Sequence, residues 1–208
     1  MSLYGRLFAR FYDRALAATE EAGLADRRRA LLAGARGRVL ELGAGTGVNL
    51  AHYPAQLDQL VLTEPEAPML ARLRRRARAA RPDATVVPAA AERLPFEDAS
   101  FDTVVATLTL CTVEDPARSL DEVRRVLAPG GRLLFIEHVR SEEPKLARRQ
   151  DLVHPLWRRI GHGCHCNRPT LTAIEAAGLH VEDVEHGRMP KSPRLVEPLI
   201  AGAAVKPR

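Results

Sequence analysis

Short apolar runs in this chain alternate with longer segments in which apolar residues recur at helical spacing. Short runs are typical of buried strands, and the helical spacing is typical of helices with one buried face. Residues 15–33 form an alanine-rich, charged helical pattern that Gly34 and Gly37 terminate. Strands are predicted at residues 38–42, 60–63, 85–87, 101–108 and 132–137, and helices at residues 68–80, 115–127 and 169–177.

The order of these elements predicts the fold class. Strands that alternate with helix-length segments form βαβ units and a mostly parallel sheet. Two more strand-like runs, residues 180–185 and 199–205, are joined by a proline-rich loop that can return the last strand antiparallel. We therefore predict an α/β, Rossmann-like, doubly wound sheet of seven strands with an antiparallel C-terminal strand.

The length and hydrophobic content indicate a single domain over residues 1–208. With 208 residues, 46% of them hydrophobic, the chain can close around one core. Residues 1–36 are predicted to form a helical cap over the active site, since Leu3, Leu7, Phe8, Phe11, Tyr12 and Leu16 have helical spacing. Residues 141–168 have no clear periodicity and are predicted to form an irregular lid or acceptor segment.

The formal net charge is +5, a balance that can favour acidic ligands, anionic membrane surfaces or nucleic acid without choosing among them. The arginines of residues 72–81 fall in one predicted helix, which we interpret as a solvated face. Three cysteines and no signal-peptide pattern suggest a reducing cytoplasm. No apolar run approaches the roughly 20 residues of a membrane span, so we expect at most peripheral membrane contact.

A glycine-rich turn follows the first predicted strand. Gly43, Gly45 and Gly47 lie at the carboxyl end of that strand, where doubly wound sheets hold ligands. Glycine allows a ligand to approach the backbone closely. The spacing is G-x-G-x-G, and Val48 stands where a dinucleotide fingerprint requires its third glycine. No Gly-Lys-Ser/Thr follows, which argues against a P-loop.

Two companions make the glycine turn more specific. Glu64 ends the second strand about twenty residues later, where a carboxylate can accept hydrogen bonds from both hydroxyls of a ribose. Residues 91–96, Ala-Glu-Arg-Leu-Pro-Phe, precede the fourth strand and can cover an adenine ring. Each alone is compatible with an ordinary loop, and together they indicate a nucleoside-like ligand.

These segments, in this order, resemble class I S-adenosylmethionine (SAM)-dependent methyltransferases over residues 39–133. The likeness includes residues 39–47, Glu64, residues 91–96, Phe101-Asp102 and residues 125–131. It implies SAM as cofactor and S-adenosylhomocysteine as product. The cofactor-binding residues that it implies are Glu41, Gly43, Ala44, Gly45, Gly47, Asn49, Glu64, Pro65, Met69, Ala91, Glu92, Leu94 and Thr107. Many relatives have an acid at the position of Ala90, so a backbone group near Ala91 or Glu92 would contact the adenine here.

Further segments are similar to the microsomal alkyl-thiol methyltransferases of animals. These are residues 47–49, 53–54, 107–113, 135–139, 157–164 and 202–206, with Arg168. The resemblance implies a small-molecule acceptor, with a thiol as one candidate. Ubiquinone and menaquinone methyltransferases are a more distant resemblance and keep a quinone-like or other hydrophobic acceptor open, methylated at carbon or oxygen.

Methyl transfer from a sulfonium is an in-line displacement, so the protein mainly aligns the acceptor and excludes water. A thiol with a pKa near 8.5 needs little help, because its thiolate is the nucleophile. His138 and His162 are candidate bases. Tyr12, Cys111 and Trp157 are candidate acceptor-binding residues, with Asp13 also near the pocket. The tight spacing of His162, Cys164, His165 and Cys166 argues against a zinc site, and we predict no metal.

Two rival functions remain at this stage. The basic charge would suit a nucleic-acid interaction module, but only 4% of residues are aromatic, which leaves little to stack on bases. Residues 107–110, Thr-Leu-Thr-Leu, also differ from the Asn/Asp-Pro-Pro-aromatic sequence common in nucleic-acid methyltransferases. We therefore expect no nucleic-acid partner. The other rival is a protein that binds SAM without turnover.

Overall fold

The computed structural model describes the backbone of residues 3–208 and the side chains from residue 11 onward. The N-terminal helix α1 spans Leu3–Thr19, which confirms the helical prediction for this segment. The side chains predicted there to face the active site at positions 3, 7 and 8 lie outside the described residues.

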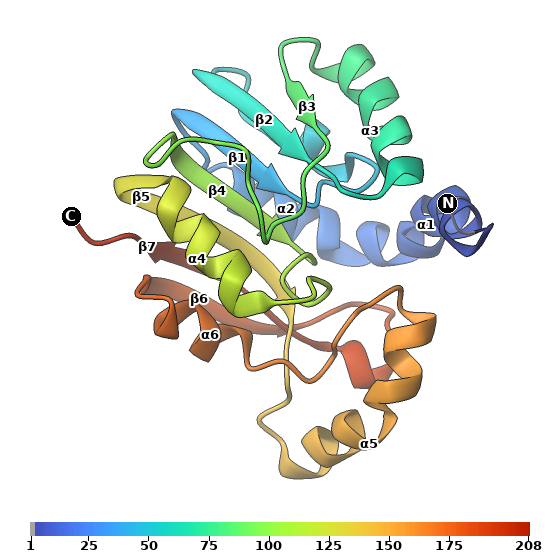
Figure 1. Ribbon diagram of the computed structural model, residues 1–208. Coiled ribbons are helices and arrows are strands. Elements are labelled where there is room, and N and C mark those ends of the chain that lie inside the picture. The colour runs from blue at the N-terminus through green and yellow to red at the C-terminus, as the bar shows by residue number, and fades with distance from the viewer. Residues whose placement is uncertain (1–2) are drawn as a thin grey trace.

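A seven-stranded sheet forms the centre of the molecule, in the order β3-β2-β1-β4-β5-β7-β6 (Figure 1). β7 pairs antiparallel with both β5 and β6, whereas the strands from β3 to β5 are parallel to their neighbours. The predicted class of sheet and its antiparallel last strand are confirmed. The strands are β1 Arg38–Leu42, β2 Gln59–Thr63, β3 Thr85–Val87, β4 Phe101–Thr107, β5 Leu127–His138, β6 His180–Arg188 and β7 Pro198–Val205.

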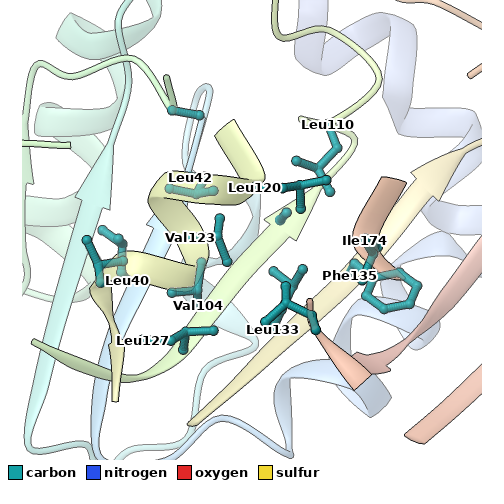
Figure 2. Close-up of a cluster of buried hydrophobic side chains, with 14 of the residues drawn as sticks. Leu40, Leu42, Val104, Leu110, Leu120, Val123, Leu127, Leu133, Phe135 and Ile174 are labelled. Atoms are coloured by element: carbon teal, nitrogen blue, oxygen red, sulfur yellow. The ribbon is translucent and has the colours of Figure 1, made fainter. Parts of the chain in front are cut away.

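Helices cover both faces of this sheet, because alternate strand residues point to opposite sides. On one face, Leu120 and Val123 of α4 (Pro116–Val126) and Ile174 of α6 (Thr170–Ala176) pack on Leu40 and Phe135 (Figure 2). On the other, α2 (Ala25–Leu32) and α3 (Ala67–Ala80) bury their apolar residues against the opposite sides of β1, β2, β4 and β5. Because β1 to β5 run parallel, their carboxyl ends lie at the same edge of the sheet, and the glycine turn follows β1 at this edge.

The sequence pattern predicted one continuous helix over residues 15–33, but the structure interrupts it. Between α1 and α2 lies a π-helical turn, Glu20–Leu24, in which Gly23 has φ 127°. Glycine adopts this conformation without a Cβ penalty, so it allows the chain to kink between the two helices. Leu24 then packs in a small cluster with Ile136, Met189 and Leu199.

Two other boundaries also differ from the predictions. β5 begins directly after α4, and Pro129-Gly130-Gly131 forms an irregularity inside the strand, where the register with β4 shifts. The amide of Gly130 and the carbonyl of Gly131 instead bond to Lys206 beyond β7. The prediction that residues 141–168 are irregular was wrong, because α5 spans Pro144–Ile160 within them. Its apolar residues face out as well as in, which obscures the helical period.

Additional short helical turns connect the larger elements, η2 Val48–Ala51 and η3 Arg194–Val196. In the part of the chain that the structure describes, no helix combines the length and apolar character needed to cross a membrane.

Candidate functional site

The glycine turn joins β1 to η2, and its three glycines have distinct tasks. Gly43, Gly45 and Gly47 all have positive φ, at 53°, 58° and 85°. A Cβ on Gly43 would stand 2.7 Å from Thr109 Cγ2, and one on Gly47 would stand 2.7 Å from Leu50 Cδ1. These two glycines allow the turn to pack against the protein. A Cβ on Gly45 would meet no atom nearer than 4.0 Å, so the space beside it is open to a ligand.

Glu64 lies directly after β2 and reaches the glycine turn. Its Oε2 accepts a hydrogen bond of 2.9 Å from the amide of Gly45, and its Oε1 accepts one of 2.8 Å from the amide of Glu66. The residue is only 5% exposed, and burial raises its pKa to about 7 against the effect of both amides. Each oxygen retains a lone pair for a hydroxyl donor, which is the arrangement that a ribose requires.

A buried polar network lies beneath the turn. Asn49 Nδ2 donates to Glu41 Oε1 at 2.9 Å, and Tyr53 donates to Glu41 Oε2 at 2.8 Å. Asn49 Nδ2 also lies 2.9 Å from Thr107 Oγ1. Burial raises the pKa of Glu41, partly offset by Tyr53, Asn49 and the charge of Arg28. The structure thus brings the predicted residues Glu41, Asn49 and Thr107 together.

Arg28 is the centre of this network and was missed by the sequence analysis. Its side chain is 1% exposed, and its Nη1 donates to Asn49 Oδ1 at 3.0 Å and to Thr107 Oγ1 at 2.9 Å. Its Nε donates to Glu20 at 3.0 Å. Arg27 and Arg29 flank it with the same residue type, so no local signal separates the buried arginine from its neighbours.

Asp13 of α1 forms hydrogen bonds with the glycine turn and with α3. Its carboxylate accepts hydrogen bonds from Thr46 Oγ1 at 2.6 Å, Arg72 Nη2 at 2.7 Å and Arg76 Nη2 at 2.6 Å. Burial opposes ionisation, but Thr46, Arg76 and Arg72 together lower the pKa of Asp13. The prediction of a solvated arginine face was therefore wrong for Arg72 and Arg76. It was also wrong for Arg81, whose side chain is 12% exposed and donates to the carbonyl of Pro54. Arg74, Arg75 and Arg78 are exposed as expected.

The residues that were predicted to lie near the adenine differ in their exposure to solvent. Pro65 is exposed, Met69 and Ala91 are buried, and Leu94 belongs to the main core. Glu92 Oε1 accepts hydrogen bonds from the amides of Glu114 and Asp115, before α4. The Glu92 carboxylate therefore positions the loop that leads into α4.

A second buried carboxylate organises the loop after β4. Glu137 accepts hydrogen bonds from the amides of Thr109 and Leu110 at Oε1 and of Cys111 at Oε2, with distances of 2.8–3.0 Å. Burial raises its pKa to about 7 against the effect of these amides. The sequence analysis passed over Glu137, although an acid inside the apolar run of β5 was a usable signal. By holding three successive amides, Glu137 fixes the position of Cys111.

Two of the predicted acceptor-binding residues, Cys111 and Trp157, lie at or near this loop. Cys111 and Cys164 are buried, with their sulfur atoms 3.9 Å apart, and this pairing and burial raise the pKa of Cys111. Trp157 of α5 lies beside Cys164. Burial raises the pKa of Tyr12 to about 12, and the charges of Cys111 and Glu64 both act on its hydroxyl. The largest of the charges that act on the Tyr12 hydroxyl is that of Arg28, which lowers its pKa.

Arg168 connects the segment after α5 to the same loop. Its guanidinium donates to the carbonyls of Leu110 and Val113, each at 2.6 Å. The amide of His165 also donates to the carbonyl of Cys111 at 2.7 Å. The segment between α5 and α6 therefore forms one wall together with residues 110–113.

The two candidate bases lie in different places. His138 ends β5, and burial lowers its pKa to about 4 against the opposing effect of the backbone of Val196 and Pro198, while its buried Nδ1 has no hydrogen-bond partner among the described residues. His162 has φ 51°, and its Nε2 lies 3.7 Å from Glu66 Oε2, two residues beyond Glu64. His162 therefore lies near the segment that follows Glu64.

Members of the cysteine and histidine cluster after α5 contact residues outside the cluster. His154 Nε2 and His165 Nδ1 are 2.7 Å apart, and burial lowers the pKa of His165 to about 4. Among residues with described side chains, no group of three or more His, Cys, Asp or Glu side chains is arranged to hold a metal ion.

Comparison with known proteins gives a consistent result. The sequence pattern of the methyltransferase domain family matches residues 40–135. The chain is 37% identical over 181 residues to human thiol S-methyltransferase TMT1B, which covers 84% of this chain and 74% of the relative. It is 39% identical over 115 residues to a demethylmenaquinone methyltransferase of Clavibacter sepedonicus, covering 55% of this chain and 46% of that protein.

Among solved structures, the fold is similar to a SAM-dependent methyltransferase from Thermotoga maritima. The TM-score is 0.70 at 22% identity, over 96% of this chain and 97% of that one. The open space beside Gly45 and the remaining lone pairs of Glu64 fit the same cofactor. The sequence comparison and the fold comparison thus agree with a SAM site beside Gly45 and Glu64, at the carboxyl edge of the sheet.

Proposed function

Because the chain belongs to the thiol S-methyltransferase family within the class I SAM-dependent methyltransferases, we propose that it methylates the sulfur of a small hydrophobic thiol. The observation that carries this proposal is the 37% identity to human thiol S-methyltransferase TMT1B, which extends over 84% of the chain. The match to the menaquinone enzyme covers 55% of the chain. The longer match includes α5 and the acceptor wall.

The residues around the proposed acceptor space suit the apolar part of a thiol acceptor. Tyr12 keeps its proton because burial raises its pKa to about 12, and Cys111 keeps its proton beside Cys164. Trp157 adds an aromatic surface. Such a wall offers apolar and polarisable contacts to an alkyl or aryl group.

In the proposed reaction, a bond forms between the acceptor sulfur and the methyl carbon while the bond from that carbon to the sulfonium breaks. SAM supplies an electrophilic methyl group, and the products are a methyl thioether, S-adenosylhomocysteine and the thiol proton. Glu64 and the turn at Gly45 hold the donor side, and Glu137 fixes the loop that carries Cys111. The cap and the segment after α5 exclude water from the line of attack.

We propose that the acceptor loses its proton to solvent before the transfer, without help from His138. An ordinary thiol is a few per cent thiolate near pH 7, and a thiolate is already a strong nucleophile. With its pKa lowered to about 4, His138 is a weak base. His162 lies near Glu66 in the segment that follows Glu64, and we assign it to cofactor enclosure.

The first experiment is an assay of S-adenosylhomocysteine formation with alkyl thiols, aryl thiols and matched phenols at saturating SAM. We expect product only with thiols, and a rate that rises with pH up to the pKa of each acceptor. The pH at which the rate is half-maximal should follow the pKa of the acceptor, and for a given acceptor it should be the same in His138→Asn as in the wild type. SAM binding without any thiol turnover would overturn the thiol proposal, and turnover of a quinone-like carbon or phenol would replace it.

We also propose that the protein acts in a reducing cytoplasm on small molecules and not on nucleic acid. The three cysteines are free, in agreement with a reducing compartment. The arginines at positions 72 and 76 are engaged by Asp13, which supports a structural use of part of the basic charge. Retention of the protein on a nucleic-acid column at physiological salt would contradict the second proposal.

A further inference from the structure

Three large apolar side chains of α5 are exposed. Leu152 is 81% exposed, Leu156 is 59% exposed and Ile160 is 60% exposed. They are spaced four residues apart, so they lie on one side of the helix. Figure 1 shows α5 at the periphery of the molecule, outside the layers that enclose the sheet.

Basic residues share this side of the helix. At 3.6 residues per turn, Lys145, Arg148, Arg149 and Arg159 fall with the three apolar residues within roughly one third of the circumference. All seven residues are exposed. We call this set the outer face of α5: Lys145, Arg148, Arg149, Leu152, Leu156, Arg159 and Ile160.

The opposite side of α5 is anchored, so the outer face cannot turn inward. Leu146, Ala147 and Gln150 are buried there. Gln150 Nε2 lies 2.7–3.1 Å from the carbonyls of Val139, Cys166 and Leu195, and its Oε1 accepts a bond of 2.8 Å from the amide of Ser141. The helix thus presents its outer face as a rigid surface.

We propose that the outer face of α5 docks on the surface of an anionic lipid bilayer. Apolar side chains flanked by lysine and arginine are the composition by which interfacial helices bind acidic headgroups while inserting apolar tips. The charge of this face matches the negative surface of such a bilayer. The proposed contact is peripheral. This proposal does not depend on whether the methyl acceptor is a thiol.

Two other occupants fit the face less well. A second copy of this chain would bring the same four basic residues opposite themselves, and three side chains offer far less than the roughly 1,000 Å² of a stable interface. An acidic protein that wraps around a target helix would need the inner side, which Leu146, Ala147 and Gln150 occupy.

Docking in this orientation would place the proposed acceptor wall next to the bilayer. Trp157 lies on the inner side of the same helix and faces Cys164. A hydrophobic acceptor dissolved in lipid would therefore reach the site over a short path along α5.

The test is co-sedimentation of the full chain with phosphatidylcholine vesicles that contain or lack phosphatidylserine. We expect binding to the serine-lipid vesicles that weakens with added salt. Leu152→Gln combined with Leu156→Gln should reduce the binding at least about tenfold, because each leucine loses its insertion into the bilayer. SAM affinity should stay unchanged, which shows that the variant is folded.

A matched pair of variants separates the outer face from net charge. Arg148→Gln with Arg149→Gln should abolish the preference for phosphatidylserine, whereas Arg74→Gln with Arg75→Gln, an equal change on exposed residues of α3, should leave it intact. Equal losses in both double variants, or no vesicle binding by the wild type, would overturn the proposal. So would a dimer in sedimentation equilibrium that the leucine variant dissociates.

Discussion

Glu64 is held in a setting that makes its charge depend on pH near neutrality. Its folded pKa lies at about 7, above that of an ordinary carboxyl group, because burial disfavours the ionised form. Only the ionised carboxylate can accept bonds from two ribose hydroxyls in addition to its two amide donors. Cofactor binding should therefore require loss of the Glu64 proton.

The first prediction concerns the affinity for SAM as a function of pH. Below pH 7 the free protein holds a proton on Glu64 that binding must release, so the dissociation constant should rise by about tenfold per pH unit. Above pH 8 it should be flat. Calorimetric titration from pH 5.5 to 8.5 measures this. In Glu64→Gln the affinity should be lower throughout and lose this slope, and a retained slope would assign the proton to another group.

Gly45 allows a second prediction that separates backbone strain from ligand space. Gly45→Ala and Gly130→Ala both place a Cβ at positive φ, 58° and 75°, with no contact closer than 3.6 Å. Each should cost about 1 kcal/mol of folding free energy. Only Gly45→Ala should abolish SAM binding, measured by ligand-induced thermal shift. If both variants bound SAM equally well, Gly45 would not be part of the cofactor site.

Among the elements, α1 depends on Asp13 for its position over the glycine turn. The bonds from Asp13 to Thr46, Arg72 and Arg76 link the cap, the turn and α3. Because a shared carboxylate serves all three elements, the cap and the turn should move together. The arginines of α3 gain their fixed positions from this acid.

The third prediction is that Asp13→Asn loosens the cap. An amide can accept the bond from Thr46 but loses both ion pairs, a change worth about 1.5 kcal/mol for partly buried charged bonds. SAM should dissociate about tenfold faster in stopped-flow measurements, and α1 should be cleaved sooner by protease. Asp26→Asn, which breaks an exposed pair with Arg29, is the control and should change neither.

At the scale of the whole molecule, Arg28 connects parts of the chain that are far apart in sequence. It bonds to Glu20 in the π-helical turn, to Asn49 in η2 and to Thr107 at the end of β4. These bonds cross the interior between the cap and the sheet. The charge of Arg28 also offsets the burial of Glu41.

The fourth prediction follows from this central position. Arg28→Met should lower the free energy of unfolding by about 3 kcal/mol, because it leaves buried acceptors and the Glu41 carboxylate without their cation. Arg27→Met removes only a surface pair with Glu185 and should change stability by less than about 1 kcal/mol. Urea unfolding compares the two. A similar cost for both variants would show that the network contributes little.

The sequence by itself determined the order and type of most elements, the class of sheet, and the pairing of the glycine turn with Glu64. These features follow from patterns between near neighbours: apolar period, glycine spacing and the residue that ends a strand. The family and its cofactor were implied by the resemblance of these segments, in this order, to class I SAM-dependent methyltransferases. The roles of Tyr12, Cys111 and Trp157 in acceptor binding remain predictions.

Only the tertiary structure decided which charged residues are buried and what they hold. Arg28 lies between two similar arginines, and its partner Thr107 is 79 residues away. Glu137 holds amides 26–28 residues away, and Asp13 reaches arginines about sixty residues further on. Local periodicity carries no information on such distant partners, because each depends on how the sheet, the cap and the loops close on one another. For the same reason, the outer face of α5 became recognisable only when its inner side was seen to be packed.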